Sequence, residues 1–240
     1  MRDYVAVDIG ASSGRLVRGT LQDGQLLLQE IHRFDNGFSE RDGHCYWDID
    51  HLYREILRGL QQAKKLGIER CMLGIDTWAV DYALLDEKGK RIGEVYAYRD
   101  GRTNAAVPQV HAVIPFARIY EKTGIQHLAF NTLYQLYAHD REELAKAKHI
   151  LLVPDYLYYL LSGQRMNEMT NASTTSLLNL QTRDYDPELL ALLGLSRSNF
   201  PALTEPGTRL GSIKPELVQE YGLPECELIV TATHDTASAV

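Results

Sequence analysis

The chain has 240 residues, of which 45% are hydrophobic and 24% charged, and its formal net charge at pH 7 is −7. This length fits one large domain or two small ones, the composition is that of a globular protein, and the negative charge argues against a nucleic-acid or membrane partner. No apolar run approaches the ~20 residues of a membrane span, and no signal peptide opens the chain, so we expect a cytoplasmic protein.

The three cysteines, Cys45, Cys71 and Cys226, are odd in number and far apart in the sequence. No two of them have the C-x-x-C spacing, so the pattern argues against a zinc site and against a disulfide framework. A reducing compartment such as the cytoplasm is the simplest expectation.

The chain is expected to open with three strands. Residues 4–7 are rich in β-formers, and residues 16–20 and 26–34 predict two further strands joined through Asp23-Gly24, a strong hairpin signal. Residues 8–15, D-I-G-A-S-S-G-R, are small and polar and indicate a tight turn between the first two strands. The order is therefore β-hairpin-β and not βαβ.

A helix and further strands follow. Asp50 can cap a helix that Gly67 closes, and apolar residues recur within it at helical spacing: Leu52, Ile56, Leu60 and Ala63. Residues 71–75 form an apolar strand that ends at Asp76, and residues 80–85 and 92–98 predict two more strands.

The second half of the chain is expected to be mixed. Residues from about 103 to 163 predict mainly helices, followed by a strand at 174–180, a short helix at 187–193 and a last strand at 227–231. A new helix opens at His234. The chain stops at Val240, one turn into that apolar helix, which leads us to expect a piece of a longer protein.

Residues 8–15 are a candidate phosphate site. Gly10 and Gly14 would let the backbone approach an anion, successive amides and two serine hydroxyls would donate to phosphate oxygens, and Arg15 would add charge. Asp8 would hold Mg²⁺ through water, as that ion prefers. The motif is neither a Walker A loop nor G-x-G-x-x-G, and a hairpin turn that merely uses glycine and serine also explains it.

Asp235 is a candidate general base. It follows a buried strand, and a carboxylate at such a strand end can accept the proton of a sugar hydroxyl that attacks the γ-phosphate of ATP. Its neighbours His234 and Thr236 would orient the sugar by hydrogen bonds. The alternative is that Asp235 only caps the helix that follows.

Trp78 and Asp81 follow a second strand end, and ligands of α/β folds bind where such ends meet. Trp78 would stack on a sugar face. Equally, Trp78 can belong to the core while Asp81 begins a hairpin.

Seven motifs together resemble the rhamnulokinase branch of the FGGY carbohydrate kinase family, over residues 5–240. They are V-D-I-G-A-S-S-G-R at 7–15, G-I-D-T-W at 74–78, A-Y-R-D at 97–100, N-T-L-Y-Q-L at 131–136, P-D-Y at 154–156, T-N-A-S-T-T at 170–175 and H-D-T-A-S-A-V at 234–240. The first motif alone would indicate only the wider actin, Hsp70 and sugar-kinase superfamily.

The resemblance implies an α/β fold with a ribonuclease-H-like mixed sheet flanked by helices, as the N-terminal domain of a two-domain kinase. Residues 1–240 would be the sugar-binding domain, with a mainly helical insertion at about 103–163, and a C-terminal nucleotide-binding domain would follow. The implied reaction is the Mg²⁺- and ATP-dependent phosphorylation of L-rhamnulose at its 1-hydroxyl in rhamnose catabolism. These 240 residues alone are then expected to be inactive.

The resemblance also assigns roles to residues. Asp235 would be the proton acceptor. ATP would be bound by Ala11, Ser12, Ser13, Gly14 and Arg15, and the sugar by Ala79, His234, Asp235 and Thr236. Ala79 departs from the family pattern, which has glycine there; alanine is tolerated if glycine serves only close backbone approach, and costly if the position needs a positive φ.

Three other functions remain open. A kinase of another ketose, such as L-fuculose, would use the same loop and base. A non-catalytic sugar sensor of the same fold would usually carry a DNA-reading helix-turn-helix before the first strand, and this chain begins directly at the strand. A chaperone-like or actin-like ATPase would not need an acidic residue beside a sugar hydroxyl.

Overall fold

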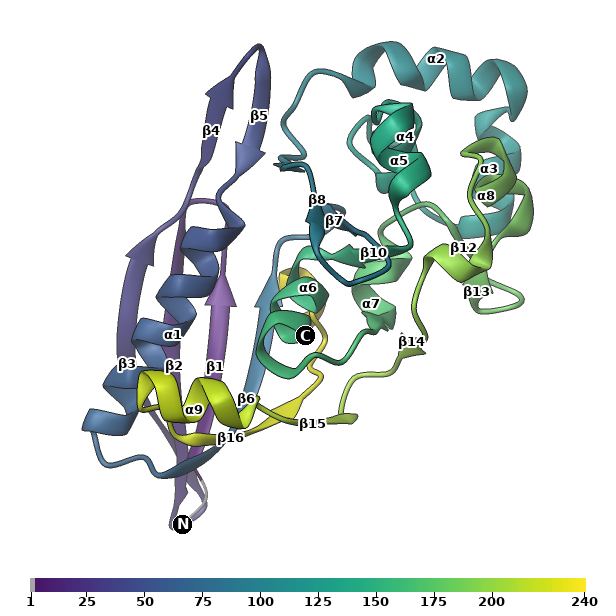
Figure 1. Cartoon of the computed structure of the whole chain (residues 1–240). Coiled ribbons are helices and arrows are strands. Elements are labelled where there is room, and N and C mark those ends of the chain that lie inside the picture. The colour runs from purple at the N-terminus through teal and green to yellow at the C-terminus, as the bar shows by residue number, and fades with distance from the viewer. Residues whose placement is uncertain (1–2) are drawn as a thin grey trace.

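Six strands form one mixed sheet, in the order β15-β16-β6-β1-β2-β3, in a computed structural model that describes residues 3–240 (Figure 1). β1, β2 and β3 are antiparallel, β6 runs parallel to β1, β16 runs parallel to β6, and β15 closes the edge antiparallel to β16. Their bounds are β1 Asp3–Ile9, β2 Ser13–Gln22, β3 Gln25–Asp35, β6 Arg70–Thr77, β15 Arg209–Ser212 and β16 Glu225–Ile229. The predicted mixed sheet and its β-hairpin-β opening are confirmed.

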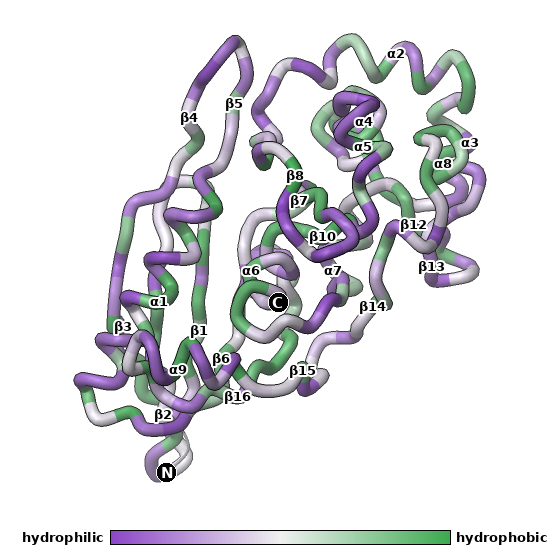
Figure 2. Tube along the Cα trace, in the orientation of Figure 1, coloured by the Kyte–Doolittle hydropathy of each residue, from purple (hydrophilic) through white to green (hydrophobic). Residues whose placement is uncertain are grey.

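One face of the sheet carries the main core. Alternate residues of β1, namely Val5, Val7 and Ile9, are buried there, since successive side chains of a strand point to opposite faces. Helices α1 (Ile49–Lys65) and α6 (Val153–Ser162) contribute to the same core, and both lie in front of the sheet in Figure 1. Figure 2 shows hydrophobic residues on α6 and on strands beside it.

Helix α1 begins two residues earlier than expected. Its N-cap is Asp48, whose carboxylate accepts the N–H of His51 at 2.7 Å. The predicted cap, Asp50, is wrong: it lies in the first turn and forms a bidentate ion pair with Arg91, at 2.8 and 3.0 Å. Gly67 follows the helix end with φ of +83°, a conformation that glycine adopts without strain.

Gly59 provides a test of packing on α1. Alanine in an exposed helix interior would stabilise by about 1 kcal/mol over glycine. Here a Cβ at position 59 would lie 2.5 Å from a methyl group of Leu16, and overpacking of a core costs about 1–3 kcal/mol. We therefore expect Gly59→Ala to lower the free energy of unfolding in urea. The control is Gln62→Ala at an exposed position of the same helix, and a stabilised Gly59→Ala variant would contradict this packing.

A second core fills the lobe at the upper right of Figure 1, with members from Tyr82 to Leu203. This range is wider than the expected insertion at 103–163. The elements of the lobe include β7 (Tyr82–Leu85), β8 (Arg91–Ile92), β10 (His149–Leu152), α2 (Thr103–Val113), α3 (Phe116–Thr123), α4 (Thr132–Tyr137), α5 (Arg141–Lys146), α7 (Met169–Ser173) and α8 (Pro187–Leu192).

The strand expected at 174–180 is wrong. Helix α7 reaches Ser173, and only Leu178–Asn179 (β12) is extended, paired with Asp184–Tyr185 (β13). The hydroxyl of Thr175 donates to the carbonyl of Ala172 at 2.6 Å, and Ser176 has φ of +57°. Thr174 and Thr175 here donate to carbonyl groups three residues earlier, which competes with an extended strand.

The remaining elements are short. They are β4 (Phe38–Arg41), β5 (His44–Trp47), β9 (Val95–Tyr96), β11 (Asn167–Glu168), β14 (Leu203–Thr204), the 3-10 turn η1 (Arg197–Asn199), α9 (Pro215–Tyr221) and α10 (Asp235–Ser238). Over residues 3–240, no helix combines the length and the apolar character that crossing a membrane requires.

Candidate functional site

Three chain segments end side by side at one edge of the sheet. Asp8 of β1 is in register with Asp76 of the parallel strand β6. The next residue of β6, Thr77, forms a bridge with His234, and its N–H donates to the carbonyl of Thr233 at 3.0 Å. The loop after β1, the turn after β6 and the segment that carries Asp235 therefore meet at the carboxyl ends of parallel strands, where ligands of α/β sheets bind.

The turn predicted between the first strands is closed by its own backbone. The N–H of Gly10 donates to the carbonyl of Ser13 at 2.9 Å. Asn36, just beyond β3, holds the turn from outside: its side chain donates to the carbonyl of Gly10 at 2.8 Å and its N–H to that of Ser12 at 3.0 Å. Ser12 is exposed, and Ala11 is half-buried against the main core. No local pattern in the sequence links Asn36 to a loop 26 residues earlier, so this contact could not be predicted.

Gly14 lies inside β2 and is buried. A Cβ there would fall 2.1 Å from the ring of Phe34 on the neighbouring strand β3. The space that glycine leaves is thus filled by an aromatic ring, so an anion cannot occupy this side of Gly14 and glycine is required here for packing. Gly10 has no such neighbour, since its Cβ would meet only the carbonyl of Ser13 at 3.5 Å.

Arg15 forms an ion pair with Asp8, with Nε and Nη2 at 2.8 and 2.7 Å from Oδ2. The two side chains remain partly exposed. A cavity of about 190 Å³ beside them is lined by Asp8, Gly10, Ser13, Arg15 and Arg33. Arg33 of β3 was not expected from the sequence, but its place in register with Arg15 puts a second guanidinium at this cavity. Two guanidinium groups and a hydroxyl form a suitable surface for phosphate oxygens.

Asp76 is the middle carboxylate of the site. Burial and the nearby charges of Asp8 and Asp235 raise its pKa to about 7, although Arg15 lowers it. Over residues 3–240, no group of three or more His, Cys, Asp or Glu side chains can enclose a metal ion. A hydrated Mg²⁺ needs only one or two carboxylates with substrate phosphates. The adjacent carboxylates Asp8 and Asp76 fit such an ion, since a cation would relieve the repulsion that raises the pKa of Asp76.

Asp235 is the first residue of α10, and the N-cap position belongs to His234. Its Oδ1 accepts the N–H of Thr236 at 2.6 Å and the hydroxyl of Thr236 at 3.2 Å. The imidazole Nε2 of His234 lies 3.6 Å from the same oxygen. The side chain of Asp235 is 42% exposed, so its carboxylate is open to a ligand at this edge of the sheet.

The segment before Asp235 is anchored by Glu168, a fully buried carboxylate that sequence analysis missed. Its Oε2 accepts the N–H and the hydroxyl of Thr233 at 3.0 and 3.1 Å. The same carboxylate accepts three more donors from α7, the N–H and hydroxyl of Thr170 and the N–H of Asn171. Five donors can stabilise a buried charge without a cation.

Ala79 is half-buried in the turn that follows β6 and has a negative φ, because it is absent from the positive-φ residues of the described chain. Alanine is therefore free of backbone strain where the family pattern has glycine. Trp78 is buried, with its ring 4.1 Å from that of Trp47, and its Nε1 donates to Asp81. The suggestion that Trp78 stacks on a sugar is wrong, since its faces belong to the core.

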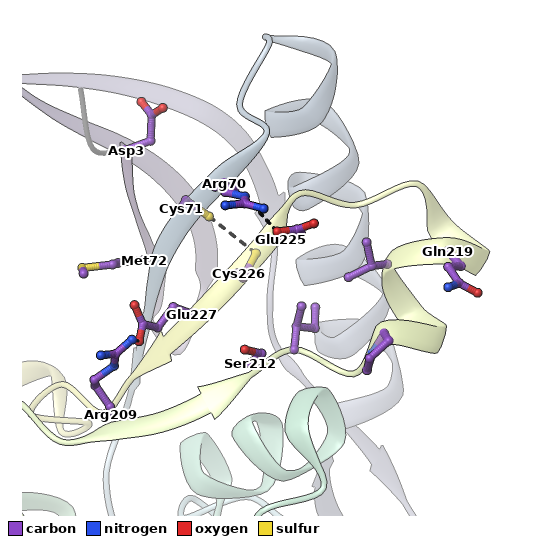
Figure 3. Close-up of a pocket in the computed structure, with 13 residues that line it drawn as sticks. Asp3, Arg70, Cys71, Met72, Arg209, Ser212, Gln219, Glu225, Cys226 and Glu227 are labelled. Carbon is purple, nitrogen blue, oxygen red and sulfur yellow. Dashed lines mark hydrogen bonds and ion pairs between the residues drawn. The ribbon is translucent and has the colours of Figure 1, made fainter.

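A larger cavity, of about 730 Å³, lies at the amino ends of the same parallel strands (Figure 3). Its arginines are paired, Arg70 with Glu225 at 2.8 Å and Arg209 with Glu227. The thiols of Cys71 and Cys226, which are neighbours in register on β6 and β16, lie 3.5 Å apart beside it. The cysteines are thus close in space although distant in sequence. This cavity is at the wrong end of the strands to join the site above.

Comparison with known proteins agrees with this geometry. Residues 3–240 match the FGGY family of carbohydrate kinases, N-terminal domain. The chain is 55% identical to a rhamnulokinase of Bacillus subtilis (strain 168), over 99% of this chain and 49% of the relative. It is 51% identical to a rhamnulokinase of Lactiplantibacillus plantarum, over 100% of this chain and 49% of that relative. The chain spans about half the length of the curated relatives it matches.

Solved structures share the fold. A ligand-bound xylulose kinase from Lactobacillus acidophilus superposes with a TM-score of 0.80 at 18% identity, over 97% of this chain and 48% of that one. A gluconate kinase from the same organism superposes with a TM-score of 0.82 at 16% sequence identity, over 96% of this chain and 48% of that one. The ribonuclease-H-like fold expected from the resemblance is thus confirmed. From the match over residues 3–240 and this shared fold, we conclude that the chain belongs to the FGGY family of carbohydrate kinases, as its N-terminal domain.

Proposed function

We propose that this chain is the acceptor-binding domain of a cytoplasmic kinase that transfers the γ-phosphate of ATP to the 1-hydroxyl of L-rhamnulose. The observation that carries the proposal is the meeting of the 10–15 loop, Asp8, Asp76 and Asp235 at one edge of the sheet. The substrate rests on the 55% identity to a rhamnulokinase. The partners would be ATP, the ketose and a C-terminal domain of the same protein.

In the proposed reaction, the sugar oxygen attacks the γ-phosphorus, the bond to the β-phosphate oxygen breaks, and ADP leaves. Asp235 accepts the proton of the hydroxyl, because its carboxylate is exposed at the site and held by Thr236. His234 and Thr236, and the backbone at Ala79, would orient the sugar. These groups are all at the ends of β6 and β16, on the acceptor side.

The phosphates would lie on residues 11–15, with Arg15 and Arg33 providing positive charge beside Ser13. Phosphoryl transfer depends on positioning and on neutralisation of charge. Asp8 and Asp76 would hold a hydrated Mg²⁺, which when bound neutralises charge on the phosphate oxygens. A Mg²⁺ ion held there would compensate the charge of Asp8, so that the guanidinium of Arg15 would be available to the phosphate oxygens.

A coupled ADP-release assay on the full-length protein tests this function. We expect ATP consumption only when a ketose is present, with the largest kcat/KM for L-rhamnulose among L-rhamnulose, L-fuculose and D-xylulose. Residues 1–240 alone are expected to give no turnover, because the C-terminal domain that would bind the nucleotide is not part of them. A larger kcat/KM for L-fuculose would contradict the assignment of L-rhamnulose as the substrate. ATP consumption that does not depend on any sugar would contradict the assignment of sugar-kinase activity.

A further inference from the structure

The turn after β6 has a strained backbone. Val80 has φ of +67°, and the N–H of Asp81 donates to the carbonyl of Ala79 at 2.9 Å, which closes a three-residue turn around the valine. A positive φ is rare for a β-branched residue, and a γ-turn of this hand is strained. Such conformations persist only where the surroundings impose them, and they concentrate at functional sites.

Buried hydrogen bonds impose this conformation. The hydroxyl of Thr132, on α4, donates to the carbonyl of Val80 at 2.6 Å. The carboxylate of Asp81 is 1% exposed and accepts four donors: Trp47 Nε1 at 2.6 Å, Trp78 Nε1 at 2.9 Å, the N–H of Tyr98 at 3.0 Å and Gln135 Nε2 at 2.8 Å. In addition, the N–H of Val153 donates to the carbonyl of Asp81 at 3.0 Å, so hydrogen bonds from several segments of the chain converge on two consecutive residues.

The turn lies within the proposed acceptor site. It begins two residues after Thr77, whose bridge partner is His234. Trp78 and Val80 are buried, whereas Ala79 between them is half-buried. Within residues 3–240, the backbone N–H groups of Ala79 and Val80 donate to no backbone carbonyl. These two N–H groups lie at the carboxyl end of β6, next to the segment that carries Asp235.

We propose that Asp81 and Thr132 are positioning residues that hold the turn Ala79–Val80–Asp81 in its strained form, so that the backbone at Ala79, through which the proposed function orients the sugar, is ordered before the sugar binds. The inference rests on the proposed function for the identity of the acceptor. Asp81 itself is enclosed by its four donors, so it acts on the sugar through the turn and not by contact. A turn that is already ordered loses little entropy when the sugar binds.

The test combines loss and rescue in the full-length protein. Asp81→Asn and Thr132→Val each remove part of the support and let Val80 relax to a negative φ. We expect each to raise the KM for L-rhamnulose about tenfold, which is a loss of about 1.4 kcal/mol, with little change in the KM for ATP. Adding Val80→Gly to either variant should restore most of the KM, because glycine takes a positive φ without strain.

Thr123→Val is the matched control, since it removes a buried hydroxyl that donates to a helix carbonyl of α3 at 2.9 Å, outside the site. It is expected to leave the KM unchanged. Thr132→Val keeps the experiment informative if Asp81→Asn does not fold. Folded variants with an unchanged KM, or a KM that Val80→Gly does not restore, would overturn the proposal.

The same variants are titrated with L-rhamnulose by calorimetry, which separates this inference from the proposed function. If the wild-type protein binds the sugar but does not turn over ATP, the proposed function fails and the dissociation constants of the variants still test the turn. If the wild-type protein turns over normally and the variants bind like it, only the turn proposal fails. If the wild-type protein does not bind the sugar at all, both fail.

Discussion

Asp235→Asn in the full-length protein is expected to lower kcat by a factor of about 10²–10⁴, the usual contribution of a general base. The amide keeps an oxygen that can accept the N–H and hydroxyl of Thr236, so the local geometry is retained while the basic carboxylate is lost. L-rhamnulose binding should be largely kept. The measurements are ketose-dependent ADP release for turnover and calorimetry for the sugar.

The control for this variant is Asp48→Asn. It removes the same charge from an exposed aspartate that caps α1, and asparagine caps helices as well as aspartate. Its activity should equal that of the wild-type protein. Robust ketose-dependent turnover by Asp235→Asn would remove the general-base role and leave Asp235 as a residue that only orders the start of α10.

Glu168→Gln is expected to cause a large loss of stability. All five hydrogen bonds to Glu168 are donated by N–H or hydroxyl groups, and two of its donors belong to Thr233, the residue before His234. Glutamine replaces one oxygen by an NH₂ group that can only donate, which leaves buried donors unpaired. Even if the amide oxygen takes the place of Oε2, the NH₂ group faces the N–H of Thr170 at the place of Oε1, and neither of these two donors then has an acceptor. At about 1–3 kcal/mol for each unpaired group, the expected loss is about 2–6 kcal/mol.

The free energy of unfolding in urea tests this prediction. Glu216→Gln is the control, because Glu216 is an exposed glutamate in the first turn of α9 and its substitution removes the same charge. It should change stability by less than about 0.5 kcal/mol. A stability of Glu168→Gln within that same range would mean that the five contacts are not made in solution. The result does not depend on which sugar the protein phosphorylates.

Local patterns in the sequence were sufficient to predict several parts of the site. The alternation of β1, the hairpin signal at Asp23-Gly24 and the aspartates that end two strands depend on neighbours within a few residues. Such short-range preferences are expressed whatever the rest of the chain does. Asp8 and Asp235 could therefore be proposed from their place beside strand ends, and the seven motifs added the family.

Prediction of secondary structure from the sequence was less accurate where side chains form hydrogen bonds with the nearby backbone. Thr174 and Thr175 suit a strand by propensity, but their hydroxyls donate to carbonyl groups of α7. Asp50 is followed by helical periodicity, yet Asp48 is the residue whose carboxylate reaches an unpaired N–H. In both places several conformations have similar local energies, and tertiary packing selects among them.

The sequence by itself thus determined five of the six strands of the central sheet, all but the edge strand β15, together with the loop at 10–15 and the acidic residue at each end of the proposed site. Only the tertiary structure decided what surrounds them: Asn36 and Arg33 beside the loop, Glu168 behind Thr233, and the strained turn at Val80. The physical reason is separation along the chain. These contacts join residues that no local period relates, and they exist only after the sheet has brought its strand ends together.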